Sequence, residues 1–241
     1  MKRFACLPPG IGRAMAIGVI AIWWPLHAAA QSFCASDGQP QPLQLVERFI
    51  NADCATCWTN TSTNQPAARA VALDWVLPGS LGDEAPLAAV ASRDGLVRME
   101  ALQQAPPNAS AVVVRPIQGS PAKTLRVAHG LPVSDYLGVS IELKPAPSPA
   151  KAWIAWLALV ETLPAGTEGS PVERNLVRNL LSRTLDKPEQ LSKTEQKRFF
   201  ESRSMYIAPG VKADRLRVIG WLENDKGQVI AAAQSRCDGG Q

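Results

Sequence analysis

Residues 43–58 read LQLVERFINADCATCW and hold the pattern on which the predicted fold depends. The first part, residues 43–49, has the apolar character of a buried strand. A short turn follows and leads into Cys54 and Cys57. Two cysteines three positions apart fall on one side of a helical turn, close enough to form a small disulfide. The stretch therefore predicts a strand that ends at a cysteine pair.

A strand that delivers such a pair to the start of a helix is typical of a thioredoxin-like redox motif. At a helix start, the sulfur of Cys54 would lie near unpaired backbone N–H groups, which favour the reactive thiolate. We therefore expect Cys54 to be the attacking sulfur and Cys57 the resolving one. Asp53 is an unfavourable neighbour for a thiolate, and Ala55 and Thr56 are uncharged, so we expect no extreme oxidant.

The pair also has other interpretations. It could be a static disulfide or two reduced, buried cysteines. It could form half of a zinc site, which needs two more ligands. Beyond the first thirty residues the chain offers Cys34, Cys237 and His129 for that purpose. His129 lies next to Gly130 in a predicted turn, with no Ser or Cys nucleophile near it in the sequence, so we expect a surface histidine rather than a catalytic base. We expect no resident metal and no cofactor.

The first thirty residues are predicted to be a secretory signal peptide. They contain a positively charged start, an apolar run of 11 residues and a small-residue cleavage site. The apolar run is shorter than the roughly 20 residues that a spanning helix needs. An uncleaved N-terminal anchor is the alternative. After cleavage, we expect no membrane span and a periplasmic or secreted protein. The positive charges of the predicted signal peptide are Lys2, Arg3 and Arg13. Its apolar run is residues 14–24, and its small-residue cleavage site is residues 28–30.

The charge of the chain gives no support for a nucleic-acid partner. The sequence has 25 Lys and Arg against 21 Asp and Glu, and the first thirty residues hold three basic residues and no acidic one. The processed chain therefore carries a net charge of about +1 and shows no basic stripe. We expect the partner to be a protein that carries a thiol or a disulfide.

Four cysteines follow the signal peptide, and an even number in an exported protein indicates disulfides. The economical pairing joins Cys54 to Cys57 and Cys34 to Cys237. The second bond would connect the two ends of the processed chain. A closure of this length is worth about 5 kcal/mol as an upper estimate, so we expect a structural role. In the alternative, Cys34 or Cys237 is a third thiol that exchanges.

The segment after the pair predicts one more strand and a helix. Residues 70–76 are almost continuously apolar, which is typical of a central strand, and residues 84–104 have helical spacing. Asp74 lies inside the strand, where a buried carboxylate could relay protons for the pair. A strand residue paired to a backbone donor is the alternative. Pro107 is the better candidate for a cis-proline that faces the pair, Pro116 is the other, and both could be ordinary trans prolines.

From residue 123 onward the pattern changes to strands separated by turn signals. A turn with the sequence Asp-Lys-Gly between two apolar runs gives the clearest hairpin of the chain, at residues 216–233. These strands favour a β-sandwich-like second half. The other apolar segments of β type lie at residues 125–128, 137–143 and 153–161.

Two segments of this second half are predicted to be helical, residues 172–185 and residues 192–203. Three tryptophans lie within the predicted strands, namely Trp153, Trp156 and Trp221. They could form a sugar-binding surface, but tryptophans spaced in this way are more often core residues. We therefore expect them in the core.

Three segments resemble a family of uncharacterised, exported, thioredoxin-like proteins of proteobacteria. They are LVERFINADCATC at residues 45–57, the strand and following turn at residues 153–178, and the hairpin at residues 218–233. Proteins of this family combine a half that carries a CxxC pair with a β-sandwich half. The resemblance implies that Cys54 and Cys57 are the thiol pair of the family.

These patterns together predict an α+β protein with a thioredoxin-like N-terminal half and a β-sandwich-like C-terminal half. The expected boundaries are residues 1–30 for the signal peptide, 31–120 for the thioredoxin-like domain and 121–241 for the β-rich domain. The expected function is thiol–disulfide exchange at Cys54 and Cys57. The alternatives are a non-catalytic envelope protein with a static or vestigial pair, and a protein that handles metal through the pair.

Overall fold

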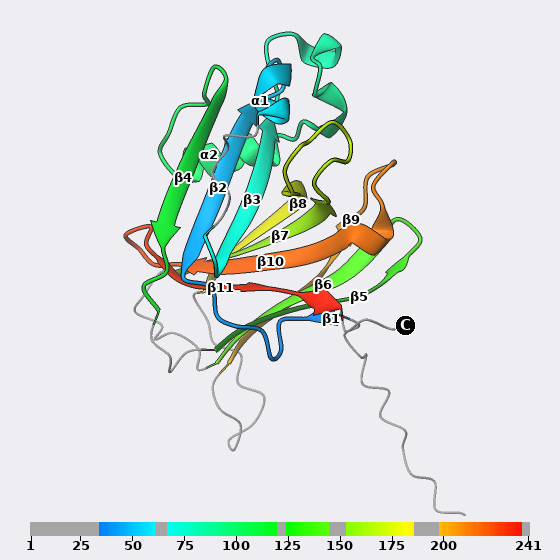
Figure 1. Ribbon diagram of the computed structural model, residues 1–241. Coiled ribbons are helices and arrows are strands. Elements are labelled where there is room, and N and C mark those ends of the chain that lie inside the picture. Colours follow the sequence, from blue (N-terminus) through cyan, green and yellow to red (C-terminus); the bar gives the residue numbers. More distant parts are fainter. Residues whose placement is uncertain (1–33, 61–66, 120–123, 145–152, 186–197, 238–241) are drawn as a thin grey trace, which may run out of the picture. The chain divides into compact units, whose positions relative to one another are not determined.

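The computed structural model describes residues 34–60, 67–119, 124–144, 153–185 and 198–237, which all belong to one compact unit (Figure 1). The predicted signal peptide lies outside the described residues. Within these, the two α-helices have only five and eight residues, and twelve strands form two sheets. The protein is therefore mostly β, and the predicted α+β class with a thioredoxin-like half is wrong. No helix in the described ranges is long and apolar enough to cross a membrane.

The larger sheet has seven strands in the order β11-β10-β7-β8-β3-β2-β4. β2 and β3 are parallel, and β4 pairs with β2 in the antiparallel sense (Figure 1). β3 is buried at every position after its first, as expected for a strand covered on both faces. The bounds are β2 Gln44–Asn51, β3 Ala70–Leu77, β4 Ser110–Pro116, β7 Trp153–Leu163, β8 Arg174–Leu185, β10 Leu216–Glu223 and β11 Val229–Gln234.

The smaller sheet has five antiparallel strands in the order β12-β1-β5-β6-β9. β6 alternates between buried and more exposed residues, which is the pattern of a strand with one face on a core. β1 is short and lies between β12 and β5, so segments from both ends of the described chain meet here. The bounds are β1 Cys34–Ala35, β5 Thr124–Val133, β6 Tyr136–Lys144, β9 Phe199–Tyr206 and β12 Arg236–Cys237.

The two sheets share one apolar core, to which β5, β6 and β9 contribute from one side and β7, β10 and β11 from the other. Gly220 of β10 lies where these strands approach closely. A Cβ atom on Gly220 would lie 2.5 Å from Cγ1 of Val127 and 3.0 Å from Cδ1 of Ile141. β10 therefore fits against β5 and β6 because this position has no side chain.

A second apolar core includes residues of α2 (Asp94–Ala101) and of the larger sheet. Met99 of α2 belongs to this core together with Phe49 and Trp75, whose rings stack at 6.0 Å between centroids. Short 3-10 turns precede α2, at η1 (Gly82–Glu84) and η2 (Ala88–Val90), and η3 (Ala213–Arg215) precedes β10. The helical spacing at residues 84–104 thus corresponds to 3-10 turns and one short α-helix.

The helix predicted for residues 172–185 is wrong, because these residues enter β8. β8 pairs with β7 along the whole length of β7, and this pairing overrides the helix-like spacing of its leucines. The helix predicted for residues 192–203 lies partly outside the described residues, and its described part, from residue 198, runs into β9. The boundary expected at residue 120 does not separate two sheets, because strands from both sides of it form the larger one.

The three tryptophans singled out in the sequence are confirmed as core residues. Trp153, Trp156 and Trp221 are all at least nine-tenths buried. The rings of Trp156 and Trp221 stack across β7 and β10, with 5.9 Å between centroids. Their burial leaves no aromatic platform for a sugar at these positions.

We predict that Gly220→Ala lowers the free energy of unfolding by about 1–3 kcal/mol, because the added methyl group overpacks the core between the sheets. Urea denaturation measures this change. Gly138→Ala is the matched control, since Gly138 lies in β6 and a Cβ atom added there would meet no other atom within 4 Å. Equal stability of the two variants would contradict the packing role of Gly220.

Candidate functional site

The cysteine pair lies directly beyond the end of β2. Cys54 is the N-cap residue of α1 (Ala55–Thr59), and Cys57 lies within this helix. The two sulfurs form a disulfide, and both residues are partly exposed. The predicted order of strand, turn, cysteine pair and helix start is therefore confirmed. Because α1 has five residues, it is too short to supply much helix dipole.

Asp53 anchors the loop that precedes the pair. Its carboxylate accepts hydrogen bonds from the backbone N–H of Ser80 at 2.7 Å, from the Ser80 hydroxyl at 2.8 Å and from the N–H of Leu81 at 3.3 Å. Gly79 leaves room for it, because a Cβ there would lie 2.0 Å from Oδ1 of Asp53. Burial raises the pKa of Asp53, but the hydrogen bonds from Ser80 and Leu81 outweigh this effect and lower it overall. The charged carboxylate thus binds a neighbouring turn.

Asn51 connects the same loop to the segment before β4. Its Oδ1 accepts a hydrogen bond from the N–H of Asp53 at 2.9 Å, and its Nδ2 donates to the carbonyl of Pro107 at 3.3 Å. Pro107 therefore lies at the cysteine end of β2. Pro116 pairs with Gln44 at the opposite end of β2. Of the two candidate prolines, only Pro107 lies near the cysteine loop.

Trp58, which follows Cys57, fixes the other side of the pair. Its indole Nε1 donates to the carbonyl of Glu168 at 2.9 Å. The guanidinium of Arg174 lies over the Trp58 ring at 4.6 Å from the centroid and donates to the Trp58 carbonyl at 2.8 Å. A buried cation on β8 therefore holds the helix that carries Cys57.

Asp74 lies between two buried arginines. Its Oδ1 accepts from Arg174 at 3.0 Å, its Oδ2 from Arg48 at 2.6 Å, and Oδ2 also accepts the backbone N–H of Asn175 at 2.8 Å. Burial lowers the pKa of Arg174, although the ion pair with Asp74 opposes this. β3 and β8 share a single paired position, Asp74 with Leu176. The carboxylate therefore completes a strand junction that has little backbone pairing of its own.

A second buried ionic cluster fastens α2 to the larger sheet. Arg98 of α2 donates to Glu47 at 2.7 Å and also pairs with Glu223, and Arg115 of β4 bridges the same two carboxylates. Burial alone would lower the pKa of Arg98 and raise that of Glu223, but these ion pairs reverse both shifts. Trp156 and Trp221 complete the cluster, because each donates an indole N–H to Glu223.

Most of the residues that hold the pair in place are not identifiable from the sequence alone. The sequence marks some of them by a charged residue inside an apolar predicted strand. Asp74, Glu47 and Arg48 all show this feature. Arg174 gives no such signal, because its segment resembles a helix. Its role depends on contacts with residues about one hundred positions away.

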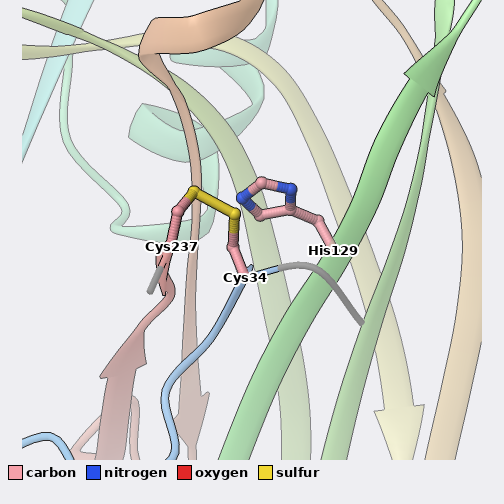
Figure 2. Close-up of side chains that lie close together, drawn as sticks. All are labelled: Cys34, His129 and Cys237. Atoms are coloured by element: carbon pink, nitrogen blue, oxygen red, sulfur yellow. A yellow bond between two sulfur atoms is a disulfide. The ribbon is translucent and has the colours of Figure 1, made fainter. Parts of the chain in front are cut away.

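The predicted disulfide between Cys34 and Cys237 is confirmed. His129 lies next to it and is 5% exposed, so its predicted position at the surface is wrong (Figure 2). Burial lowers the pKa of His129, the hydrogen bond to the Gly130 carbonyl opposes this, and the charge of Arg217 adds to the lowering. The structure thus contains one cysteine pair with partly exposed residues and another beside a buried imidazole.

A cavity of about 460 Å³ lies at a different place, and neither cysteine pair lines it. Its wall includes residues 36–42, which precede β2, and parts of β5, β6 and β11. The cations on its wall include Arg69, Arg126, Lys144 and Arg236, alongside the carboxylates of Asp37 and Glu142. This cavity is therefore no substrate pocket for the Cys54–Cys57 pair.

We predict that Asp74→Asn lowers the free energy of unfolding by about 3–5 kcal/mol, because it leaves Arg48 and Arg174 buried without a counter-charge. Chemical denaturation measures the loss. Asp37→Asn is the control: Asp37 pairs with Arg126 at 2.8 Å, but its side chain is 62% exposed, so the expected loss is about 0–1 kcal/mol. A loss for Asp74→Asn no larger than the control would contradict the junction role.

No protein-family model matches the chain, and no curated protein matches it. Among solved structures the chain is similar to HBP35 of Porphyromonas gingivalis, with a TM-score of 0.47 and 10% sequence identity. The similarity covers 80% of this chain and 74% of that one. A similarity of this size carries no argument about the function of the chain.

Proposed function

We propose that the protein performs thiol–disulfide exchange through Cys54 and Cys57, with a partner protein that carries a thiol or a disulfide. A thiolate of the partner attacks Sγ of Cys54, the Cys54–Cys57 bond breaks, and Cys57 leaves as a thiolate. A second thiol of the partner then displaces Cys54. The partner becomes oxidised and the pair reduced, and the reverse sequence oxidises the pair.

The observation that carries this proposal is the accessibility of the pair on an anchored loop. Cys54 and Cys57 are both partly exposed, and Ala55 and Thr56 between them are exposed and small. In the other disulfide, by contrast, Cys237 is partly exposed but Cys34 is only 1% exposed. A partner sulfur must approach in line with the bond that it breaks, so access favours exchange at Cys54–Cys57.

The contacts around the pair support exchange without unfolding. Asp53 and Asn51 tie the preceding loop to the segments before β4 and after β3, and Trp58 is held from β8. None of these hydrogen bonds involves a cysteine sulfur, so breaking the disulfide removes none of them directly. Two nearby sulfurs that stay close after reduction form their disulfide again readily, because little chain entropy is lost.

The proposal includes a location outside the cytosol, in the periplasm or the external medium. Two disulfides within the described residues are typical of proteins in oxidising compartments. The predicted signal peptide and the resemblance of residues 45–57 to exported proteobacterial proteins with a CxxC pair add support. Localisation of a fusion to a reporter that is active only outside the cytosol tests this part.

We predict that mild treatment of the native protein with a dithiol reductant opens Cys54–Cys57 before Cys34–Cys237. The reason is that both cysteines of the first pair are partly exposed, whereas in the second pair Cys34 is buried. Alkylation of the freed thiols followed by peptide mass analysis measures the order. Simultaneous opening of both bonds, or earlier opening of Cys34–Cys237, would contradict the accessibility on which the proposal rests.

We predict that Cys54→Ser abolishes the reduction of a disulfide substrate such as insulin, because it removes the attacking sulfur. Turbidity of reduced insulin chains measures the activity. The matched control replaces the other pair, in Cys34→Ser with Cys237→Ser, and should retain activity if the variant stays folded by circular dichroism. Absence of activity in the unmodified protein would favour the alternative of a static disulfide in a non-catalytic envelope protein.

A further inference from the structure

Cys237, Cys34 and His129 form one row across three neighbouring strands. Cys34 of β1 pairs directly with Cys237 of β12 on one side and with His129 of β5 on the other. Directly paired residues of antiparallel strands project from the same face of a sheet. Their ligand atoms accordingly all lie within 4.8 Å of one another (Figure 2).

The imidazole of His129 is oriented as a ligand would be. Its Nδ1 makes a hydrogen bond of 2.9 Å with the carbonyl of Gly130, a bond that requires the proton on Nδ1. Nε2 then carries the free lone pair. Nε2 has no hydrogen-bond partner, and it is buried in a residue that is only 5% exposed. Figure 2 shows the ring edge with Nε2 facing the disulfide.

An unpartnered buried acceptor is costly, so this arrangement needs an explanation. Metal-binding histidines typically donate one ring N–H to a backbone carbonyl and coordinate through the other nitrogen. The bond from Nδ1 to Gly130 together with the free Nε2 has this form. The disulfide occupies the place where two further ligands would be, and it does not use the lone pair of Nε2.

We propose that the reduced form of Cys34 and Cys237 binds one Cu(I) ion together with Nε2 of His129. Thiolates are soft ligands that select Cu(I), and imidazole also suits copper. Among the described residues the cluster offers three ligands, one fewer than the four that closed zinc sites normally use. The site is separate from Cys54 and Cys57 and does not depend on their exchange activity.

Before Cu(I) can bind, a dithiol reductant must open the Cys34–Cys237 disulfide. A protein dithiol reduces the Cys34–Cys237 bond by two electrons and becomes a disulfide itself. The two new thiols then bind Cu(I) and release two protons, while the copper keeps its oxidation state. The same thiols cannot be bonded to each other and to the metal, so disulfide formation and metal binding exclude one another.

The decisive experiment uses the processed chain with Cys54→Ser and Cys57→Ser, so that only the second pair can bind metal. The reduced protein is titrated anaerobically with Cu(I) against a chromogenic chelator. We expect one Cu(I) per chain, a raised thermal unfolding temperature and an X-ray absorption spectrum with two sulfurs and one nitrogen. His129→Gln should lower the affinity by more than about tenfold, since loss of even an outer-shell partner typically costs 10–100-fold.

The matched control carries Cys34→Ser and Cys237→Ser and keeps the other pair. Its Cu(I) affinity should not change when His129→Gln is added. Circular dichroism of each reduced, metal-free variant shows whether it is folded. The proposal is overturned if His129→Gln leaves the affinity of the first variant unchanged, if the spectrum shows sulfur ligands alone, or if Cu(I) does not raise the unfolding temperature.

Discussion

The seven-stranded sheet depends on one carboxylate at its weakest junction. β3 and β8 share a single paired position, and Asp74 replaces the missing backbone pairing by accepting the N–H of Asn175 and both guanidinium groups beside it. Without this carboxylate, two buried cations would repel each other where the N-terminal and C-terminal strands meet. A polar residue in an apolar strand is tolerated here because both of its carboxylate oxygens accept hydrogen bonds.

The same junction connects the fold to the cysteine pair. Arg174 binds Asp74 with one nitrogen and the carbonyl of Trp58 with another, so the strand junction and the helix of Cys57 share one side chain. On the other side of the pair, Asp53 binds the turn at Ser80. Long-range contacts therefore hold the cysteines in position, so the pair does not depend on a long helix for its placement.

The local features of this protein could be predicted from its sequence, but their assembly could not. The strand that leads into the turn before Cys54 was predictable, as was the pairing of Cys34 with Cys237, because spacing and cysteine number decide them. Residues 172–185 misled the prediction, since their leucine spacing suits a helix and only pairing with β7 makes them a strand. His129 misled it as well, because the neighbouring glycine suggested a turn while the register of β5 places it in the interior.

The bond between Cys34 and Cys237 also imposes an order of events on the growing chain, because it spans 203 residues. β1 has its place between β12 and β5, so it cannot be enclosed until residues 236–237 have been synthesised. Contacts between such distant segments form late, after shorter-range strands have paired. Cys34 therefore cannot form this bond until 203 further residues have been synthesised, and its oxidation with Cys237 fixes β1 in a sheet whose other strands come from later in the chain.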